Sequence, residues 1–250
     1  MEQGEPADGQ VVYRLREVLK NRAKGGSAFE LCVPSLDIGR GEFVAIVGAS
    51  GCGKSTLLDM LGLVLSPSQC GEFSLRVAGQ KHSLMDLGEA SLARLRRAHL
   101  GYVLQTGGLL PFLTVGNNVH LPCRLNAQRG GQLQVKTLLE RLKIGDQAHK
   151  KPQFLSGGQR QRAAIARALA HHPPVVLADE PTAAVDKFTA LEIRDQFKEL
   201  TANLGITLVM VTHDEALVSQ AADRILTFQV EPLGPNHTRS TLREASPDIS

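Results

Sequence analysis

The sequence predicts an α/β fold, in which a mostly parallel β-sheet flanked by helices carries an N-terminal antiparallel β layer and a helical insertion. Alternating apolar residues, typical of half-buried strands, occur early in the chain at 11–15, 29–33 and 73–77. Short apolar runs, typical of parallel strands covered on both faces, occur at 43–47 and 175–178, and 206–211 is expected to form the next buried strand.

We expect a single domain across the 250 residues, since no internal repeat or low-complexity segment divides them. The α/β core is predicted over about 10–105 and 173–230, and the helical subdomain over about 106–172. An apolar helix face in that subdomain would comprise Leu133, Val135, Leu138, Leu139 and Leu142. The ends, 1–9 and 235–250, carry few large apolar residues and are expected to be loose.

The composition and charge of the chain indicate which cellular compartment and which classes of partner to expect. A net charge of +3 is too mild to indicate a nucleic-acid partner. The four cysteines show neither C-x-x-C spacing nor partnering histidines, which argues against zinc and disulfides and favours a reducing compartment. No apolar run approaches the roughly 18 residues of a membrane helix. We therefore expect a chain that is cytosolic or held on a membrane by a partner.

A glycine-rich loop directly follows the apolar run 43–47. It fits the pattern G-x-x-x-x-G-K-[ST] between a predicted strand and a predicted helix, the context in which this motif binds phosphate. Lys54 would reach the β- and γ-phosphates of a nucleotide, and the Ser55 hydroxyl would hold Mg²⁺. The nucleotide-binding residues predicted here are Gly48, Ala49, Ser50, Gly51, Cys52, Gly53, Lys54, Ser55 and Thr56. The loop alone leaves kinases, GTPases and motor ATPases open.

Three further polar residues follow predicted strands that should end at one edge of the sheet. Asp179 can hold Mg²⁺ through water, and Glu180 can polarise a water for attack on the γ-phosphate. His213 follows the run 206–212 and could contact the γ-phosphate or hold that water against Glu180. An Asp-Glu pair after a strand is more commonly a helix cap, and the phosphate loop upstream is what favours catalysis.

A second anion site is predicted where Leu155, Ser156, Gly157, Gly158 and Gln159 precede a helical run. A hydroxyl and bare backbone N–H groups at a helix N-terminus suit phosphate. Two such helix ends in one chain suggest a nucleotide sandwiched between two subunits.

These motifs, together with Gln105 and Asp186, occur in the order found in the nucleotide-binding subunits of ABC transporters, which the chain resembles over about residues 36–228. The resemblance is greatest to the subgroup of macrolide-export, lipoprotein-release and cell-division permeases. It covers the Walker A loop at residues 48–56, the LSGGQ signature at 155–159 and the Walker B strand that ends at Asp179 and Glu180.

The resemblance implies a role for each motif. ATP and Mg²⁺ would be the ligands, with Ser55, Gln105 and Asp179 around the metal, Glu180 as general base and His213 as its partner. Residues 155–159 of one copy would close over ATP held by the other, and Asp186 would organise the opposite site.

The resemblance also implies partners. These are a second copy or a paralogous nucleotide-binding subunit, and separate transmembrane permease subunits; the subgroup also admits a periplasmic adaptor, and no nucleic acid is expected. The chain would lie on the cytoplasmic face of the inner membrane. Alternatives are a soluble ABC ATPase of DNA repair or translation, and a regulatory module without turnover. No aromatic residue aligns near Arg22, where the subgroup stacks adenine, and Tyr13 and Phe29 are the nearby rings.

Overall fold

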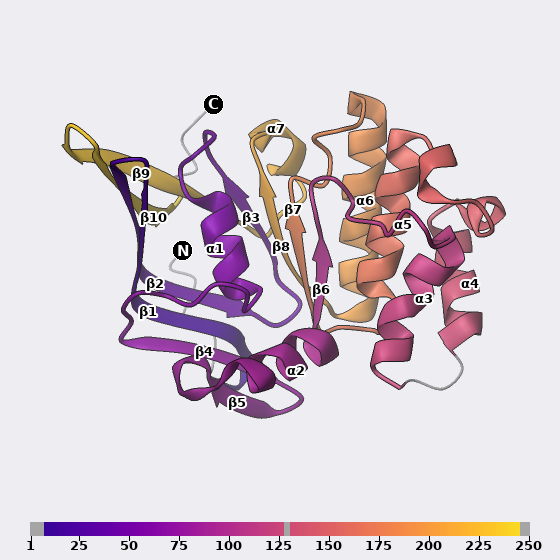
Figure 1. Cartoon of the computed structure of the whole chain (residues 1–250), viewed down its shortest axis with the longest axis horizontal. Helices are drawn as coiled ribbons and strands as arrows, with labels where there is room; N and C mark the ends of the chain where they lie inside the picture. Colours follow the sequence, from indigo (N-terminus) through magenta and orange to yellow (C-terminus); the bar gives the residue numbers. More distant parts are fainter. Residues whose placement is uncertain (1–7, 128–130, 246–250) are drawn as a thin grey trace.

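The computed structural model of the chain describes residues 8–127 and 131–245. Its ten strands form one curled sheet in the order β5-β4-β1-β2-β10-β9-β3-β8-β7-β6 (Figure 1). The parallel part comprises β3 (Phe43–Val47), β6 (Leu100–Val103), β7 (Val175–Asp179) and β8 (Thr207–Thr212). The antiparallel part comprises β1 (Val11–Lys24), β2 (Ser27–Gly39), β4 (Glu72–Val77) and β5 (Gln80–Ser83). The predicted α/β fold with an antiparallel layer is confirmed.

Helices cover the sheet and form the insertion. The helix after β3 is α1 (Lys54–Leu61), and α2 (Glu89–His99) precedes β6. Three helices of the insertion gather at one end of the molecule (Figure 1), namely α3 (Val115–Leu125), α4 (Gly131–Arg141) and α5 (Gly157–Leu169). After α5 the chain returns to the sheet at β7, and α6 (Lys187–Leu204) then follows β7 while α7 (Glu215–Val218) follows β8. Single 3-10 turns lie at Asp8–Gln10, Leu84–Asp86, Gly145–Gln147 and Pro152–Phe154.

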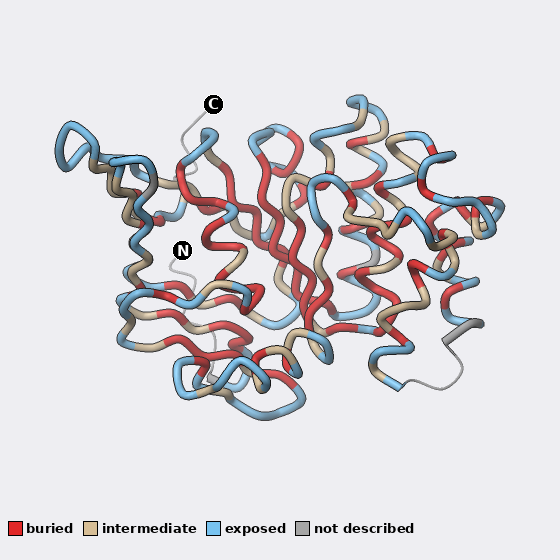
Figure 2. Tube along the Cα trace, in the orientation of Figure 1, coloured by how far each residue is buried: buried red, intermediate tan, exposed pale blue. Residues whose placement is uncertain are grey.

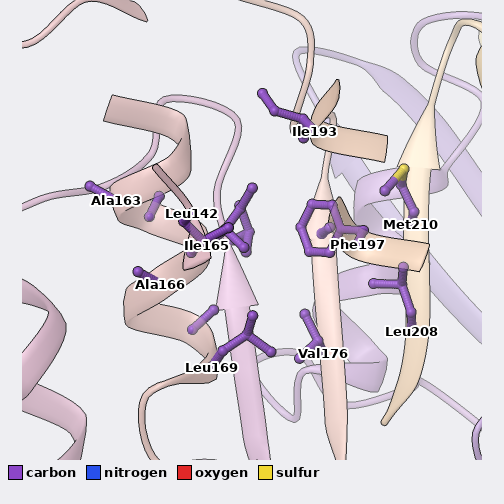
Figure 3. Close-up of a cluster of buried hydrophobic side chains, with 14 of the residues drawn as sticks. Leu142, Ala163, Ile165, Ala166, Leu169, Val176, Ile193, Phe197, Leu208 and Met210 are labelled. Atoms are coloured by element: carbon purple, nitrogen blue, oxygen red, sulfur yellow. The ribbon is translucent and has the colours of Figure 1, made fainter. Parts of the chain in front are cut away.

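The central strands are apolar along most of their length because each of their faces contacts a different core. In β8, Leu208 and Met210 belong to a core shared with α5 and α6, whereas Val209 and Val211 belong to a core shared with α1 and the antiparallel layer. Figure 2 shows this burial along the middle of the sheet. Figure 3 shows Phe197 of α6 beside these strands, with α5 on its other side. A strand covered on both faces is therefore expected to be apolar along its middle, as the sequence of β8 shows between Thr207 and Thr212.

The C-terminal end differs from the prediction. Residues 235–250 were expected to be loose, but β9 (Arg224–Gly234) turns back into β10 (His237–Glu244), which pairs with β9 on one side and β2 on the other. This hairpin joins the parallel and antiparallel parts of the sheet. The prediction was wrong because β10 is largely polar in sequence, and it is its neighbours in the sheet that bury Ser240 and Leu242. Residues 246–250, and residues 1–7 of the other end expected to be loose, lie outside the described residues.

One residue of the predicted helix face is also misplaced. Leu133 is 73% exposed, although Val135, Leu139 and Leu142 are buried as expected. Leu133 lies in the first turn of α4, ahead of the part that packs on α3 and α5.

The hairpin yields a stability prediction. Leu242→Ala should lower the free energy of unfolding by about 2–5 kcal/mol, because it removes a fully packed side chain from the core. Val230→Ala, at a half-exposed position of the same hairpin, should change it by less than about 1 kcal/mol. Urea unfolding of both variants measures the difference, and equal, small effects would mean that the C-terminal end is loose after all.

Candidate active site

The glycine-rich loop between β3 and α1 is packed too tightly for side chains at two of its glycines. A Cβ at Gly48 would lie 2.9 Å from Cys52 Sγ, and Gly48 has a φ of 153°. Gly53 has a φ of 107°, and a Cβ there would lie 3.1 Å from Phe29 Cζ and 3.2 Å from Leu31 Cδ1. L-residues with a side chain rarely adopt these angles. Glycine is therefore required both for the turn and for the close approach of β2.

Lys54, the first residue of α1, is held against the loop. Its Nζ donates hydrogen bonds to the carbonyl oxygens of Gly48 at 2.7 Å and Ala49 at 2.9 Å, and lies 3.9 Å from Glu180 Oε1. The side chain is only 6% exposed. A fixed ammonium group with little water around it is suited to bind an anion.

A cavity of about 560 Å³ brings most of the predicted residues together. It is lined by Arg22, Phe29, Ser50, Gly51, Gly53, Lys54, Ser55, Thr56, Gln105, Asp179, Glu180 and His213. The loop, Gln105 and the three residues from the ends of β7 and β8 thus meet at one edge of the sheet, as predicted. Of the predicted loop residues, Gly48, Ala49 and Cys52 do not line it, and neither do residues 155–159 or Asp186.

The two carboxylates of the cavity have different partners. Ser55 Oγ donates to Asp179 Oδ1 at 3.3 Å, and burial raises the pKa of Asp179 above its usual value although that hydrogen bond lowers it. Glu180 Oε2 lies 3.0 Å from His213 Nδ1. The Glu180 backbone has a φ of 42°, and its N–H donates to the Val211 carbonyl at 2.9 Å. Such a conformation in a non-glycine residue is commonly found at functional sites.

The donor set at this edge suits magnesium. Mg²⁺ prefers oxygen ligands and completes its shell with water and substrate phosphates. The Ser55 hydroxyl and the Asp179 carboxylate are adjacent, and a cation would offset the cost of burying the ionised carboxylate. In the described ranges, 8–127 and 131–245, no three or more His, Cys, Asp or Glu side chains are grouped so that they could hold a metal ion. A metal ion beside Asp179 would therefore also need hydroxyl, water or phosphate ligands.

Residues 155–159, the signature segment, begin α5 on the surface. Ser156 Oγ accepts a hydrogen bond from the Gln159 N–H, and Gln159 Oε1 accepts one from the Ser156 N–H, so that the two residues form a capping box. Leu155 is buried in the core and anchors the segment. The helix end predicted as a second anion site is therefore present, and it begins at Gly157.

The signature segment packs on the residues around Asp186 in the same chain. A Cβ at Gly157 would lie 3.1 Å from the Ala184 carbonyl oxygen, and one at Gly158 would lie 2.9 Å from Thr189 Cγ2. Asp186 caps α6 by accepting hydrogen bonds from the Thr189 N–H at 3.1 Å and its hydroxyl at 2.7 Å. The signature segment and the start of α6 thus pack closely against each other as one unit.

Some residues at the site were missed or misjudged. Tyr13 is fully buried and donates to the Leu61 carbonyl, so it is a core residue and cannot face a base. Phe29 and Arg22 do line the cavity. Arg167 of α5 was missed, and its guanidinium donates to the carbonyls of Gly107 and Gly108, just after Gln105. A lone arginine within a helix gives no sequence signal for contacts so distant in the chain.

A strand, a phosphate loop and a helix that hold a lysine beside two carboxylates and a histidine define a P-loop nucleoside triphosphatase. The ABC transporter family model matches residues 32–183. The chain therefore belongs to the ABC transporter family and is an ATPase cassette of that family, as its sequence predicts. Among the described residues, no helix combines the length and the apolar character needed to cross a membrane.

Similar proteins bear names from the predicted subgroup. The chain is 46% identical to the lipoprotein-releasing system ATP-binding protein LolD of Xylella fastidiosa, over 76% of this chain and 78% of LolD. It is 45% identical to the macrolide export ATP-binding/permease protein MacB 2 of Aeromonas hydrophila over 78% of this chain, and so spans only 29% of that relative. A dimeric post-hydrolysis structure of the ATP-binding cassette MJ0796 with ADP and Pi has a TM-score of 0.74 at 34% identity, covering 95% of this chain and 100% of that one.

The packing of the signature segment predicts a compensation between two positions. Gly158→Ala should lower the free energy of unfolding by about 1–3 kcal/mol, because the new methyl group meets the stiff Thr189 side chain. Thr189→Ser removes Cγ2 and keeps the hydroxyl that donates a hydrogen bond to Asp186. It should therefore restore stability in the double variant. A double-mutant cycle measured by chemical unfolding checks this. Additivity within about 0.5 kcal/mol would show that the two residues do not touch.

Proposed function

We propose that the cavity binds Mg-ATP and that its residues hydrolyse it to drive a separate membrane permease. The observation that carries the proposal is the convergence of Lys54, Asp179, Glu180 and His213 on one cavity beside the phosphate loop. ATP phosphates would lie against the N–H groups of the loop and the Lys54 ammonium. Ser55, Gln105 and Asp179 would hold Mg²⁺, which when bound neutralises charge on the β- and γ-phosphate oxygens.

The proposed chemistry assigns Glu180 as general base. A water oxygen bonds to the γ-phosphorus while a proton passes from that water to Glu180, and the bond to the β,γ-bridging oxygen breaks. The products are ADP and inorganic phosphate. His213, 3.0 Å from Glu180 Oε2, holds that carboxylate in place, and Lys54 balances the charge on the phosphates.

A complete site would need a second copy of the chain or a paralogue. The exposed N-terminus of α5 can bind an anion but does not line the cavity of its own chain. In a head-to-tail pair, Ser156 to Gln159 of one copy would cover the γ-phosphate bound by the other. The dimeric state of the MJ0796 cassette supports this arrangement.

The partner that uses the energy would dock on the helical insertion. A groove of about 670 Å³ lies between α3, α4 and residues 145–149, lined by Asn117, His120, Val135 and Leu139 among others. The name of the MacB relative, an ATP-binding/permease protein, supports a permease as the occupant. A periplasmic adaptor beyond the permease is part of the proposal that rests on the resemblance alone. The chain would then lie on the cytoplasmic face of the inner membrane.

The adenine base could stack on two residues that line the cavity, because Arg22 offers a cation and Phe29 offers a ring.

Glu180→Gln tests the catalytic assignment. The amide cannot accept the proton, so steady-state turnover should fall by about a hundredfold or more while the affinity for Mg-ATP changes by less than about threefold. Phosphate release and nucleotide titration measure the two quantities. Glu199→Gln, on the exposed side of α6, is the matched control and should retain wild-type turnover. Near-normal hydrolysis in Glu180→Gln would contradict the assignment, and no binding of ATP by the wild type would contradict the proposed site.

A further inference from the structure

We propose that the C-terminal hairpin, β9 and β10, braces the phosphate loop, and that Ser240 is a positioning residue for nucleotide binding. Ser240 lies in the middle of β10 and is fully buried. Its hydroxyl donates a hydrogen bond to the carbonyl oxygen of Cys52, 188 positions earlier in the chain. The inference rests on the proposed binding of nucleotide at the loop.

The orientation of one peptide unit connects this hydrogen bond to phosphate binding. The Cys52 carbonyl and the Gly53 N–H belong to the same peptide, and in a trans peptide these groups point in opposite directions. The described residues contain no cis peptide bond. Because Ser240 holds the Cys52 carbonyl on the side of β10, the Gly53 N–H is directed to the other side. Gly53 lines the cavity, so Ser240 fixes the direction in which this N–H meets a phosphate.

Apolar contacts from the same layer complete the brace. A Cβ at Gly48 would lie 3.8 Å from Phe228 Cδ2 of β9, and one at Gly53 would lie within 3.2 Å of both Phe29 and Leu31 of β2. Ser240 pairs with Leu31 in the sheet, and Leu242 pairs with Phe228. The phosphate loop is thus supported by three neighbouring strands, with β10 between β2 and β9 (Figure 1). Ser240 supplies the one directional contact in this brace, its hydrogen bond to Cys52, whereas Phe29, Leu31 and Phe228 fill the space beside the loop glycines.

Ser240→Ala removes the hydrogen bond and keeps the small side chain. The dissociation constant for Mg-ADP should rise by about three- to tenfold, the range expected for losing one buried hydrogen bond. In ATP hydrolysis, KM should rise by a similar factor while kcat stays within about twofold, since the loop holds substrate and transition state alike. A merely structural role would lower the melting temperature without this split between KM and kcat.

Two further variants control for packing. Thr241→Val removes a hydroxyl from the adjacent residue, whose side chain is on the opposite face of β10 because side chains alternate along a strand, and it should bind Mg-ADP like the wild type. Ser240→Cys keeps a weaker donor in nearly the same space and should give an intermediate affinity. Melting temperatures of the nucleotide-free variants report whether each is folded.

Calorimetric titration of Mg-ADP into the full chain distinguishes the outcomes. A specific loss of affinity in Ser240→Ala, with folded protein and normal Thr241→Val, supports the proposal. An unchanged affinity in Ser240→Ala, or an equal loss in Thr241→Val, would overturn it while leaving the proposed nucleotide site standing. A wild-type chain that does not bind Mg-ADP would overturn both.

Discussion

The fold depends on how closely the antiparallel layer approaches the underside of the phosphate loop. The glycines of the loop have only backbone to present to the cavity, so their conformation has to be set by the residues packed against them. Phe29 and Leu31 leave little room for a Cβ at Gly53, where φ is 107°, and Ser240 holds the neighbouring carbonyl. The ten-stranded sheet curls so that β2, β10 and β9 reach this place. The N-terminal layer and the C-terminal hairpin are therefore part of the site even though they carry none of its catalytic groups.

A second packed unit would supply the other half of the proposed shared site. The start of α5 and the start of α6 pack together through Gly158 and Thr189, and each is capped by its own polar residue, Ser156 or Asp186. Arg167 of α5 also binds the backbone after Gln105, which links this unit to the cavity within the chain. Movement of Gln105 on binding nucleotide would thus be passed to the helical insertion and to whatever docks there.

Local pattern was enough to predict the parts of the molecule whose burial or chemistry is encoded in consecutive residues. The apolar runs at β3, β7 and β8, the loop before Lys54 and the edge that carries Asp179, Glu180 and His213 all follow from periodicity and motif spacing. The hairpin could not be predicted, because β10 is largely polar in sequence and one of the two strands that enclose it, β2, is distant in the chain. The same reason hid the contacts of Ser240 and Arg167. Tyr13 was misjudged because proximity in the chain says nothing of which face of a strand a ring occupies.

A mixing experiment tests most directly whether two copies of the chain share each ATP site. Lys54→Ala disables the phosphate loop, and Ser156→Asp keeps the helix cap but places a negative charge where the partner's phosphates would lie. Each variant alone should be inactive. Mixed, they form pairs in which one intact loop faces one intact signature segment, so the account predicts ATP hydrolysis that neither variant shows alone. A mixture no more active than the sum of its components would contradict the shared site.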